Sequence, residues 1–291
     1  MHDHEPSVRS EHFVLFYETD DELFDAVDGF IAGGGPDAMA IIVATEDHRD
    51  RFARALPNAQ LIDARTLLSR FNDDGVLDPD AFEACVGELI RLAGSEGRPV
   101  RVFGEMVALL WNEGLVAQAI ELESFWNALA ETLPFALLCA YPSTLVLDSD
   151  EPTLVNEVCQ AHRPVRSASG AENLEVRAFA AVPHAIAEAR RFVASKAEVT
   201  SPEQLDKLLL IVSELATNAV QHAGTPFVVE VVSSRDTVCV AVRDRSKTEI
   251  GASAAPMESE CGRGLGLVDA LADSWGVRWT KLGKVVWAEV A

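Results

Sequence analysis

The chain has 291 residues, of which 48% are hydrophobic and 24% charged, a composition that excludes a disordered, collagen-like or wholly coiled-coil protein. Acidic residues outnumber basic ones by 46 to 24, and the resulting net charge of −22 disfavours direct binding of nucleic acid. The imbalance is uneven, with a net −20 over residues 1–165 and −2 over residues 166–291, so the sequence predicts two different domains.

The sequence contains neither a membrane-span pattern nor a secretory signal. Its longest apolar runs, 38–44 and 135–141, are far shorter than the roughly 18 residues needed to cross a bilayer. The first ten residues are polar, and we expect them to be disordered. The five cysteines show no CxxC spacing, which is typical of reduced core thiols rather than of a disulfide or zinc framework. We therefore expect a cytoplasmic protein with no membrane association.

Apolar runs alternate with helical patterns through the first half of the chain. Strands are predicted at 13–17, 38–44, 60–63, 100–103 and 135–140. Helical periodicity lies between them at 23–31, 47–56, 78–93 and 105–131, with a further helix from 64 and a turn at 72–75. Strands and helices in this order indicate a parallel sheet covered by helices, so the first domain, 11–161, is predicted to be α/β.

A polar stretch at 161–173 breaks the periodicity where the charge balance changes, and we place a linker at 162–173. The order of elements differs in the second domain, 174–291. Strands are predicted at 174–182, 227–233, 238–243, 275–280 and 285–290, and helices at 183–197, at 202–223 and after Gly264. A flexible stretch is expected at 245–261. This grouping indicates an α+β sandwich of helices against a sheet.

Three pieces of the second domain could converge on one ligand. Glu214 and Asn218 are four apart on the long helix, so they project from one face, where an amide oxygen and a carboxylate can hold a hydrated magnesium ion. Asp244 follows an apolar strand and can accept a hydrogen bond from an amino group such as that of adenine. The run from Gly262 to Leu267 opens a helix, where glycines let backbone amides approach a phosphate.

The order and spacing of these pieces closely resemble the GHKL ATP-binding superfamily, and more narrowly its anti-sigma-factor serine/threonine kinase branch with the HATPase fold. The resemblance implies ATP and Mg²⁺ as cofactors. It implies that Glu214 is the polarising or general-base carboxylate, that Asn218 coordinates Mg²⁺, and that Asp244 binds the adenine amino group. The sequence departs from the superfamily's DxGxG pattern, because Ser246 and Thr248 stand where glycines would be expected.

The same resemblance covers about 176–291. It implies that Gly262, Gly264 and Gly266 form the phosphate loop at the end of the ATP lid. Arg263 lies inside that loop, where its guanidinium either clamps the γ-phosphate or remains a solvated lid residue.

Histidine kinases share this superfamily, but they need a helical hairpin with a phosphoacceptor histidine ahead of the ATPase domain. Here the linker leads directly to the domain's first strand and to a helix at 183–197 that resembles the first helix of the anti-sigma branch. His222 lies within the nucleotide helix itself and is interpreted as a helix-end residue rather than a phosphoacceptor. A serine or threonine on a partner protein is therefore the expected acceptor.

The first half resembles the MEDS domain, a sensory module with a fold similar to RecA-like ATPases, over about 11–161. The motifs that carry this resemblance are ATEDHR at 44–49, RPVRVFGEMV at 98–107, LW at 110–111, LE at 122–123, WN at 126–127 and FALLCAYP at 135–142, with Phe71 followed by Gly75. The family's ligand is poorly defined, with small hydrocarbon derivatives proposed. The Gly-rich run 33–36 is not a P-loop, since no GK[ST] follows it.

The residues themselves suggest where such a ligand could bind. Glu105 follows a predicted strand end, the position at which open α/β sheets bind ligands. Trp111 and Trp126 could form the walls of a small pocket, although tryptophans at helical spacing are also ordinary core residues. His2 and His4 lie in the polar terminus and are not interpreted as a metal site.

The sequence thus predicts a sensory domain that controls an ATP-binding serine/threonine kinase. The resemblance implies that the kinase acts on an anti-anti-sigma (STAS-type) partner and sequesters a sigma factor, and that the protein forms a homodimer. Two alternatives remain open: a non-catalytic, nucleotide-switched binding module, and a histidine-kinase-type sensor. Detectable phosphotransfer would separate the first alternative from the kinase, and an acid-labile phosphohistidine would favour the second.

Overall fold

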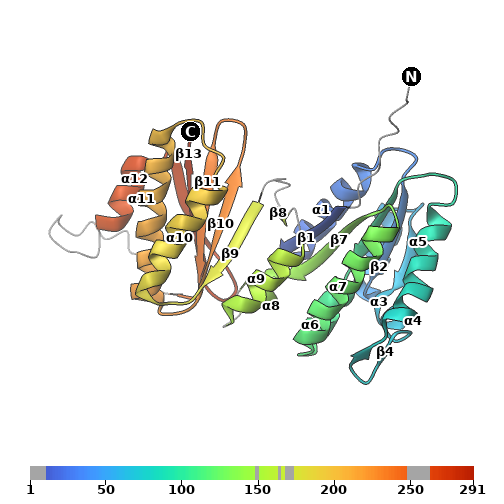
Figure 1. The fold of residues 1–291 in the computed structure, drawn as a ribbon. Coiled ribbons are helices and arrows are strands. Elements are labelled where there is room, and N and C mark those ends of the chain that lie inside the picture. Colours follow the sequence, from blue (N-terminus) through green and yellow to red (C-terminus); the bar gives the residue numbers. More distant parts are fainter. Residues whose placement is uncertain (1–10, 148–150, 163–164, 168–173, 248–262) are drawn as a thin grey trace. The chain divides into compact units, whose positions relative to one another are not determined.

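The computed structural model describes residues 11–147, 151–162, 165–167, 174–247 and 263–291 (Figure 1). The expected disordered segment 1–10 and most of the expected flexible stretch 245–261 lie outside these residues. The chain divides into two compact units: unit 1 is Met1–Leu145 with Gln160–Gly170, and unit 2 is Val146–Cys159 with Ala171–Ala291. Residues 146–159, which the sequence analysis put in the first domain, thus group with unit 2.

Unit 1 is built on a parallel sheet, so the α/β prediction for the first domain is confirmed. Its strands occur in the spatial order β8-β1-β7-β6-β2-β3, and every neighbouring pair is parallel. The strands are β1 (Glu11–Tyr17), β2 (Met39–Ala44), β3 (Gln60–Asp63), β6 (Val100–Gly104), β7 (Ala136–Pro142) and β8 (Val165–Ser167). The central strands are buried almost throughout, which explains why their sequences are continuous apolar runs rather than alternating ones.

Helices connect these parallel strands. They are α1 (Asp20–Ala32), α2 (Glu46–Ala55), α3 (Ala64–Leu68), α4 (Pro79–Phe82), α5 (Glu88–Ala93), α6 (Met106–Asn112), α7 (Val116–Thr132) and α8 (Ser143–Val146). A π-helical turn, η1 (Glu83–Gly87), joins α4 to α5, and a small hairpin of β4 (Asn72–Asp73) and β5 (Val76–Leu77) precedes them. The start of α1 illustrates the local cause of these boundaries: Thr19 accepts a hydrogen bond from the Glu22 amide and caps the helix.

Two segments of unit 1 differ from the sequence prediction. The single helix expected at 105–131 is two helices, because Gly114 has a positive φ of 79° that ends α6 and lets α7 begin in a new direction. The expected linker 162–173 contains β8, whose backbone pairs with β1. Its polar composition concealed this strand, since a strand of three residues has no apolar run and is defined by its backbone pairing.

Unit 2 packs helices against an antiparallel sheet. The strand order is β12-β13-β11-β10-β9, and all neighbours are antiparallel. The strands are β9 (Leu174–Phe179), β10 (Phe227–Ser233), β11 (Val238–Asp244), β12 (Ser274–Trp279) and β13 (Lys284–Val290). The helices are α9 (Pro152–Ala161), α10 (Pro183–Lys196), α11 (Pro202–Asn218) with the π turn η2 (Ala219–Ala223), and α12 (Arg263–Leu271). The α+β prediction is confirmed.

One face of this sheet forms the core with α10, α11 and α12, which lie along it (Figure 1). Alternate residues of β11 and β13 point to these helices, which is why Val240, Val242 and Ala288 are buried. On strand β9, the Asn156 side chain of α9 bonds both backbone groups of Ala178, at 2.9 and 3.2 Å. The Asn156 amide thus satisfies the two backbone groups of this residue.

None of the helices in the described part of the chain combines the length and apolarity that a bilayer crossing requires.

Candidate functional site

The long helix α11 presents Glu214 and Asn218 on one face. Ser201 caps its start by accepting a hydrogen bond from the Gln204 amide at 3.1 Å, and Pro202 occupies the first turn. The opposite side of the helix is buried in the unit 2 core, with Ile211, Val212 and Leu215 among its members. Because the core holds that side, Glu214 and Asn218 are held half-buried on the other.

Gly264 of α12 lies directly against these two side chains. A β-carbon built on Gly264 would come within 2.9 Å of Glu214 Oε2 and within 3.8 Å of Asn218 Oδ1. Any larger residue at this position would require the Glu214 carboxylate to shift. The fold therefore brings together three residues that the sequence separates by as many as 50 positions, and it joins the predicted carboxylate and amide to the predicted phosphate loop.

Asp244 ends β11 and is buried, with 4% of its surface exposed. Its Oδ1 atom accepts two hydrogen bonds, from the Ser246 amide at 2.8 Å and from the Lys284 ammonium at 2.8 Å. Lys284 lies opposite Asp244 in the ladder of β11 and β13 and is itself buried. Neither bond uses Oδ2. The sequence analysis missed Lys284, since a lysine at a strand start carries no signal of a partner 40 residues away.

The backbone at Gly283 lies very close to the backbone of Asp244 and Arg245. A β-carbon on Gly283 would stand 1.9 Å from the carbonyl oxygen of Asp244 and 2.6 Å from the α-carbon of Arg245, so this position requires glycine. The Gly283 amide also donates to Thr280 Oγ1 at 3.0 Å, which fixes the turn between β12 and β13. The carboxylate of Asp244 is therefore positioned both through its side chain and through its backbone.

The structure describes only some of the remaining residues that were predicted to bind the nucleotide. Gly262 lies outside the described residues, and of Arg263 only the backbone, at the start of α12, is described. Gly266 is exposed one turn into α12. His222 lies in the π turn η2 that continues α11, and it is exposed, in agreement with its interpretation as a helix-end residue.

In unit 1, Glu105 stands where β6 ends, at the carboxyl edge of the parallel sheet. It is 3% exposed and accepts hydrogen bonds from the Thr45 amide at 2.7 Å and the Thr45 hydroxyl at 3.2 Å through Oε2. Its Oε1 atom contacts His48 Nδ1, and His48 Nε2 lies 3.6 Å from the Asp20 carboxylate. Residues that follow β1, β2 and β6 thus meet at one edge, as the topology of an open parallel sheet requires.

The electrostatics of this edge are set by Glu105. Its hydrogen bond raises the pKa of His48, although partial burial of the imidazole acts in the opposite direction. Burial, assisted by the charge of Glu105, raises the pKa of Tyr17 well above its ordinary value. These side chains form a polar, partly charged group at the strand ends, which is the chemistry to expect of a ligand site there.

The two predicted pocket tryptophans are buried among the protein's own groups. Trp111 donates from Nε1 to the carbonyl oxygen of Leu145 at 3.1 Å and packs edge-on against Tyr141. Trp126 is 1% exposed and packs edge-on against Phe82. Both serve as core residues in these contacts, and their role as pocket walls stays a prediction.

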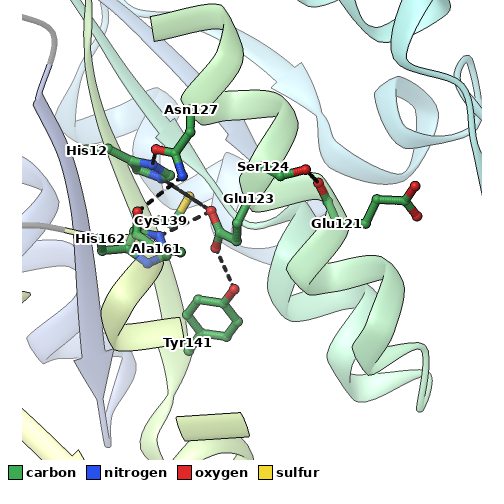
Figure 2. A network of polar contacts seen from close by, with 9 residues as sticks. All are labelled: His12, Glu121, Glu123, Ser124, Asn127, Cys139, Tyr141, Ala161 and His162. Atoms are coloured by element: carbon green, nitrogen blue, oxygen red, sulfur yellow. Dashed lines mark hydrogen bonds and ion pairs between the residues drawn. The ribbon is translucent and has the colours of Figure 1, made fainter. Parts of the chain in front are cut away.

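A second polar group in unit 1 went unnoticed in the sequence analysis. His12 of β1, Glu123 of α7, Cys139 of β7 and His162 after α9 converge in the interior (Figure 2). Glu123 Oε2 lies 3.2 Å from His12 Nε2 and 3.1 Å from His162 Nε2, and all four residues are buried. We call this group the His-Cys-Glu cluster.

The charge on Glu123 governs this cluster. Complete burial acts to raise its pKa, but the imidazoles of His162 and His12 outweigh that effect and hold the pKa well below its usual range. Burial and the neighbouring Glu123 carboxylate raise the pKa of the Cys139 thiol. The cluster therefore keeps a carboxylate ionised in the core by means of two imidazoles.

No sequence motif could have revealed it, because its members are 111, 16 and 23 positions apart and each stands alone in an apolar or polar run. The usable signal was the pair of isolated polar residues, Glu123 in an apolar helix face and His12 near the start of the apolar strand β1. Only the order of strands in the sheet brings β1 next to β7 and so places His12 beside Cys139.

The fold and these sites define a protein of two modules, a parallel α/β module followed by a histidine kinase-like ATPase module, whose family model matches residues 179–290. The model of MEDS, described as MEthanogen/methylotroph, DcmR Sensory domain, matches residues 11–163, more than half of the chain. The chain therefore belongs to the MEDS family, and the resemblance of its two halves to a MEDS domain and to a histidine kinase-like ATPase domain is confirmed.

Comparison with curated proteins gave no match. Among solved structures, the chain is similar to the crystal structure of the RsbU and RsbW domains of Rv1364c from Mycobacterium tuberculosis, with 17% identity over 40% of this chain and a TM-score of 0.29. The matched part spans 32% of that structure's chain, about a third. A TM-score this low establishes no shared arrangement.

Proposed function

We propose that this protein is a signalling regulator in which the MEDS unit controls an ATP-dependent serine/threonine protein kinase of the anti-sigma-factor type. The observation that carries the kinase half is the approach of Gly264 to Glu214 and Asn218. This approach places the start of a helix, a natural phosphate-binding position, beside a carboxylate and an amide. A family model for a histidine kinase-like ATPase over the same residues supports nucleotide binding there.

The residues present fit a Mg²⁺-nucleotide. Asn218 offers an amide oxygen and Glu214 a carboxylate, both half-buried and side by side, which are hard oxygen ligands of the kind Mg²⁺ prefers. The ion, when bound, would neutralise charge on the phosphates. Gly264 would present its backbone amide to those phosphates. Glu214 Oε2 would then orient, and accept the proton from, the attacking hydroxyl of a substrate serine or threonine.

Asp244 is proposed to accept a hydrogen bond from the adenine amino group. The Lys284 ammonium and the Ser246 amide hold its Oδ1, so the carboxylate is fixed in orientation before a nucleotide arrives. Ser246 stands where the superfamily has a glycine, yet its amide still bonds back to Asp244. The departure from the DxGxG pattern is therefore compatible with a positioned adenine acceptor. Arg263 and Gly262 complete the proposed phosphate loop.

The proposed partners follow from the anti-sigma branch that the sequence resembles. They are an anti-anti-sigma (STAS-type) protein as phosphorylation substrate and a sigma factor as the sequestered protein, with a homodimer as the acting form. The MEDS unit, proposed to be RecA-like, would bind a small molecule at the edge that carries Glu105, with Trp111 and Trp126 proposed as pocket walls. A ligand there would compete with His48 and Thr45 for the Glu105 carboxylate.

Calorimetric titration tests the nucleotide site. Mg²⁺-ATP is expected to bind the wild type with micromolar affinity and to lose most of that binding in Asn218→Ala, because the amide oxygen is the proposed metal ligand. The matched control is Asn112→Ala, which removes an exposed amide at the end of α6 in unit 1. Glu214→Gln is expected to retain binding but to lose phosphotransfer by about 10²-fold or more.

A phosphotransfer assay beside the titration distinguishes the two alternatives from the kinase. Binding without phosphotransfer to any serine or threonine would support a nucleotide-switched binding module. A phosphohistidine lost in acid would support a histidine kinase. Absence of Mg²⁺-ATP binding in the wild type would overturn the kinase proposal altogether.

A further inference from the structure

The His-Cys-Glu cluster has the composition and compactness of a metal site. One ligand atom from each of His12, Glu123, Cys139 and His162 lies within 4.8 Å of the other three. Imidazole nitrogen, thiolate sulfur and carboxylate oxygen are the donors that zinc takes in proteins. The four residues come from three elements and the segment after α9, all within unit 1.

Four of the six spacings between the ligand atoms match the edges of a zinc tetrahedron, and all six lie within 4.8 Å. Ligands about 2.0–2.3 Å from zinc, at tetrahedral angles, are separated by about 3.3 Å for nitrogen and oxygen and about 3.6 Å where sulfur is involved. Glu123 Oε2 lies 3.2 Å from His12 Nε2, 3.1 Å from His162 Nε2 and 3.5 Å from Cys139 Sγ. Cys139 Sγ in turn lies 3.3 Å from His12 Nε2.

An outer layer of hydrogen bonds orients these donors. Asn127 donates from Nδ2 to the carbonyl oxygen of Ala161 at 3.2 Å, so its Oδ1 faces His12 and accepts from Nδ1 at 2.8 Å (Figure 2). With its proton on Nδ1, the His12 ring directs the lone pair of Nε2 into the cluster. Tyr141 donates to Glu123 Oε1 at 2.5 Å, which leaves Oε2 directed at the other three atoms. Outer bonds of this kind are characteristic of metal-ligating histidines and carboxylates.

Charge explains why such a group is tolerated in the core. A divalent cation bound by one thiolate, one carboxylate and two neutral imidazoles has no net charge. A neutral, fully coordinated site costs far less to bury than an isolated ionised carboxylate. Binding would displace the Cys139 thiol proton and leave both imidazoles neutral, so metal uptake releases protons.

We propose that His12, Glu123, Cys139 and His162 form a tetrahedral site for a divalent transition-metal ion, with zinc as the expected occupant. The site is separate from the Glu105 edge and does not depend on the kinase proposal. It ties β1, β7 and α7 to His162, which stands between α9 and β8. Metal loss would therefore release a residue just after the point where the chain returns from unit 2 (Val146–Cys159) to unit 1 (Gln160–Gly170).

Cobalt substitution tests the site in the full-length protein without an affinity tag. The wild type, as purified without chelator, is expected to contain about one zinc per chain by elemental mass spectrometry. After removal of that metal, Co²⁺ titration should give tetrahedral visible bands and a thiolate-to-cobalt charge-transfer band that saturate at one equivalent. One equivalent of Zn²⁺ should abolish both. These readouts need no variant, so they remain decisive if a substitution impairs folding.

Substitutions of individual side chains test which residues are the metal ligands. Cys139→Ser is nearly isosteric and is expected to lose the charge-transfer band, while His162→Gln is expected to weaken Co²⁺ binding at least tenfold. The matched control is Cys159→Ser, which removes a partly buried thiol in unit 2 and should leave every band unchanged. A variant with both His2 and His4 replaced by alanine should also behave as wild type. Added Zn²⁺ should raise the unfolding temperature of the wild type and of both controls only.

Three outcomes would overturn the proposal. The first is a wild type that contains no metal and gives no thiolate-to-cobalt band. The second is a band that persists in Cys139→Ser or disappears in Cys159→Ser. The third is binding lost in the His2 and His4 double variant, which would place the metal at the terminus.

Discussion

Single buried charges dominate the chemistry of unit 1, and each has a partner from a distant part of the sequence. Glu105 is held by Thr45 and His48, and Glu123 by His12 and His162. A carboxylate in the core persists only where hydrogen bonds and opposite charges replace water. Such pairs perturb pKa values, and perturbed groups in a sensory module are the first candidates for ligand contact.

The pair of His48 and Glu105 should make the stability of unit 1 depend on pH. Because the folded-state pKa of His48 is raised, its contribution is fully present below the unfolded pKa of about 6.5 and is lost as pH rises through the folded value. Asp20 and Tyr17 also face this group. His48→Gln should therefore be least stable relative to wild type near pH 6 and approach it by pH 9.

Urea unfolding at pH steps between 6 and 9 measures this difference. The control is His184→Gln, an exposed histidine at the start of α10 in unit 2. A stability gap for His48→Gln that is constant across the range would show that protonation of this imidazole does not contribute.

At the scale of elements, the proposed nucleotide site is a junction between two helices. Burial of one side of α11 in the core fixes the rotation of that helix. The start of α12 packs at Gly264 against the polar side of α11. Helix periodicity predicted which side of α11 faces solvent. It could not predict that α12 covers part of that side, since this depends on how the sheet carries both helices.

Gly264→Ala separates stability from catalysis at this junction. The new β-carbon would come within 2.9 Å of Glu214 Oε2, a flexible side-chain end that can move aside. We expect an unfolding free energy within about 1 kcal/mol of wild type, since alanine also favours helix. Phosphotransfer is expected to fall about 10²-fold, because a displacement near 1 Å at a catalytic group is enough for that loss.

The matched control for helix propensity is Gly29→Ala in α1 of unit 1, where a β-carbon meets nothing within 4 Å. It should be slightly more stable than wild type and should transfer phosphate normally. Unfolding curves and a phosphotransfer assay on both variants provide the comparison. Normal phosphotransfer in Gly264→Ala would contradict the proposed role of Glu214.

At the scale of the whole molecule, net charge is distributed unevenly along the chain. Residues 1–165 carry a net −20, whereas residues 166–291 carry −2. Like charges within a compact unit repel one another, and salt screens that repulsion over about 10 Å at 0.1 M. Counted by the two units, unit 1 carries a net −15 and unit 2 a net −7, so we expect the stability of unit 1 to depend more strongly on ionic strength than that of unit 2.

Raising NaCl from about 10 mM to 0.2 M should accordingly stabilise unit 1 more than unit 2. Hydrogen exchange followed by mass spectrometry localises the effect, with peptides from β7 expected to gain more protection than peptides from β11. Sucrose at equal osmolality is the control, since it acts on both units without screening charge. Equal gains in both peptides under salt would contradict the expectation.

The sequence by itself determined the local elements and the nucleotide signature. Buried parallel strands are continuous apolar runs, and amphipathic helices have a period of 3.6, so β2, β7, β10 and α11 could be predicted within a few residues. The residues Glu214 and Asn218 were identifiable because their spacing of four is set by the helix alone. The domain limits 11–161 and 174–291 and the roles of individual site residues stay predictions.

Only the tertiary structure decided which distant residues meet. The partner of Asp244 is Lys284, and the partner of Glu105 is His48, because strand neighbours in the sheet are not neighbours in the chain. The His-Cys-Glu cluster shows this most clearly, since its ligand atoms are set by the pairing of β1 with β7 and by the packing of α7 against them. Periodicity fixes which face of an element a residue occupies, but the packing of elements fixes what that face contacts.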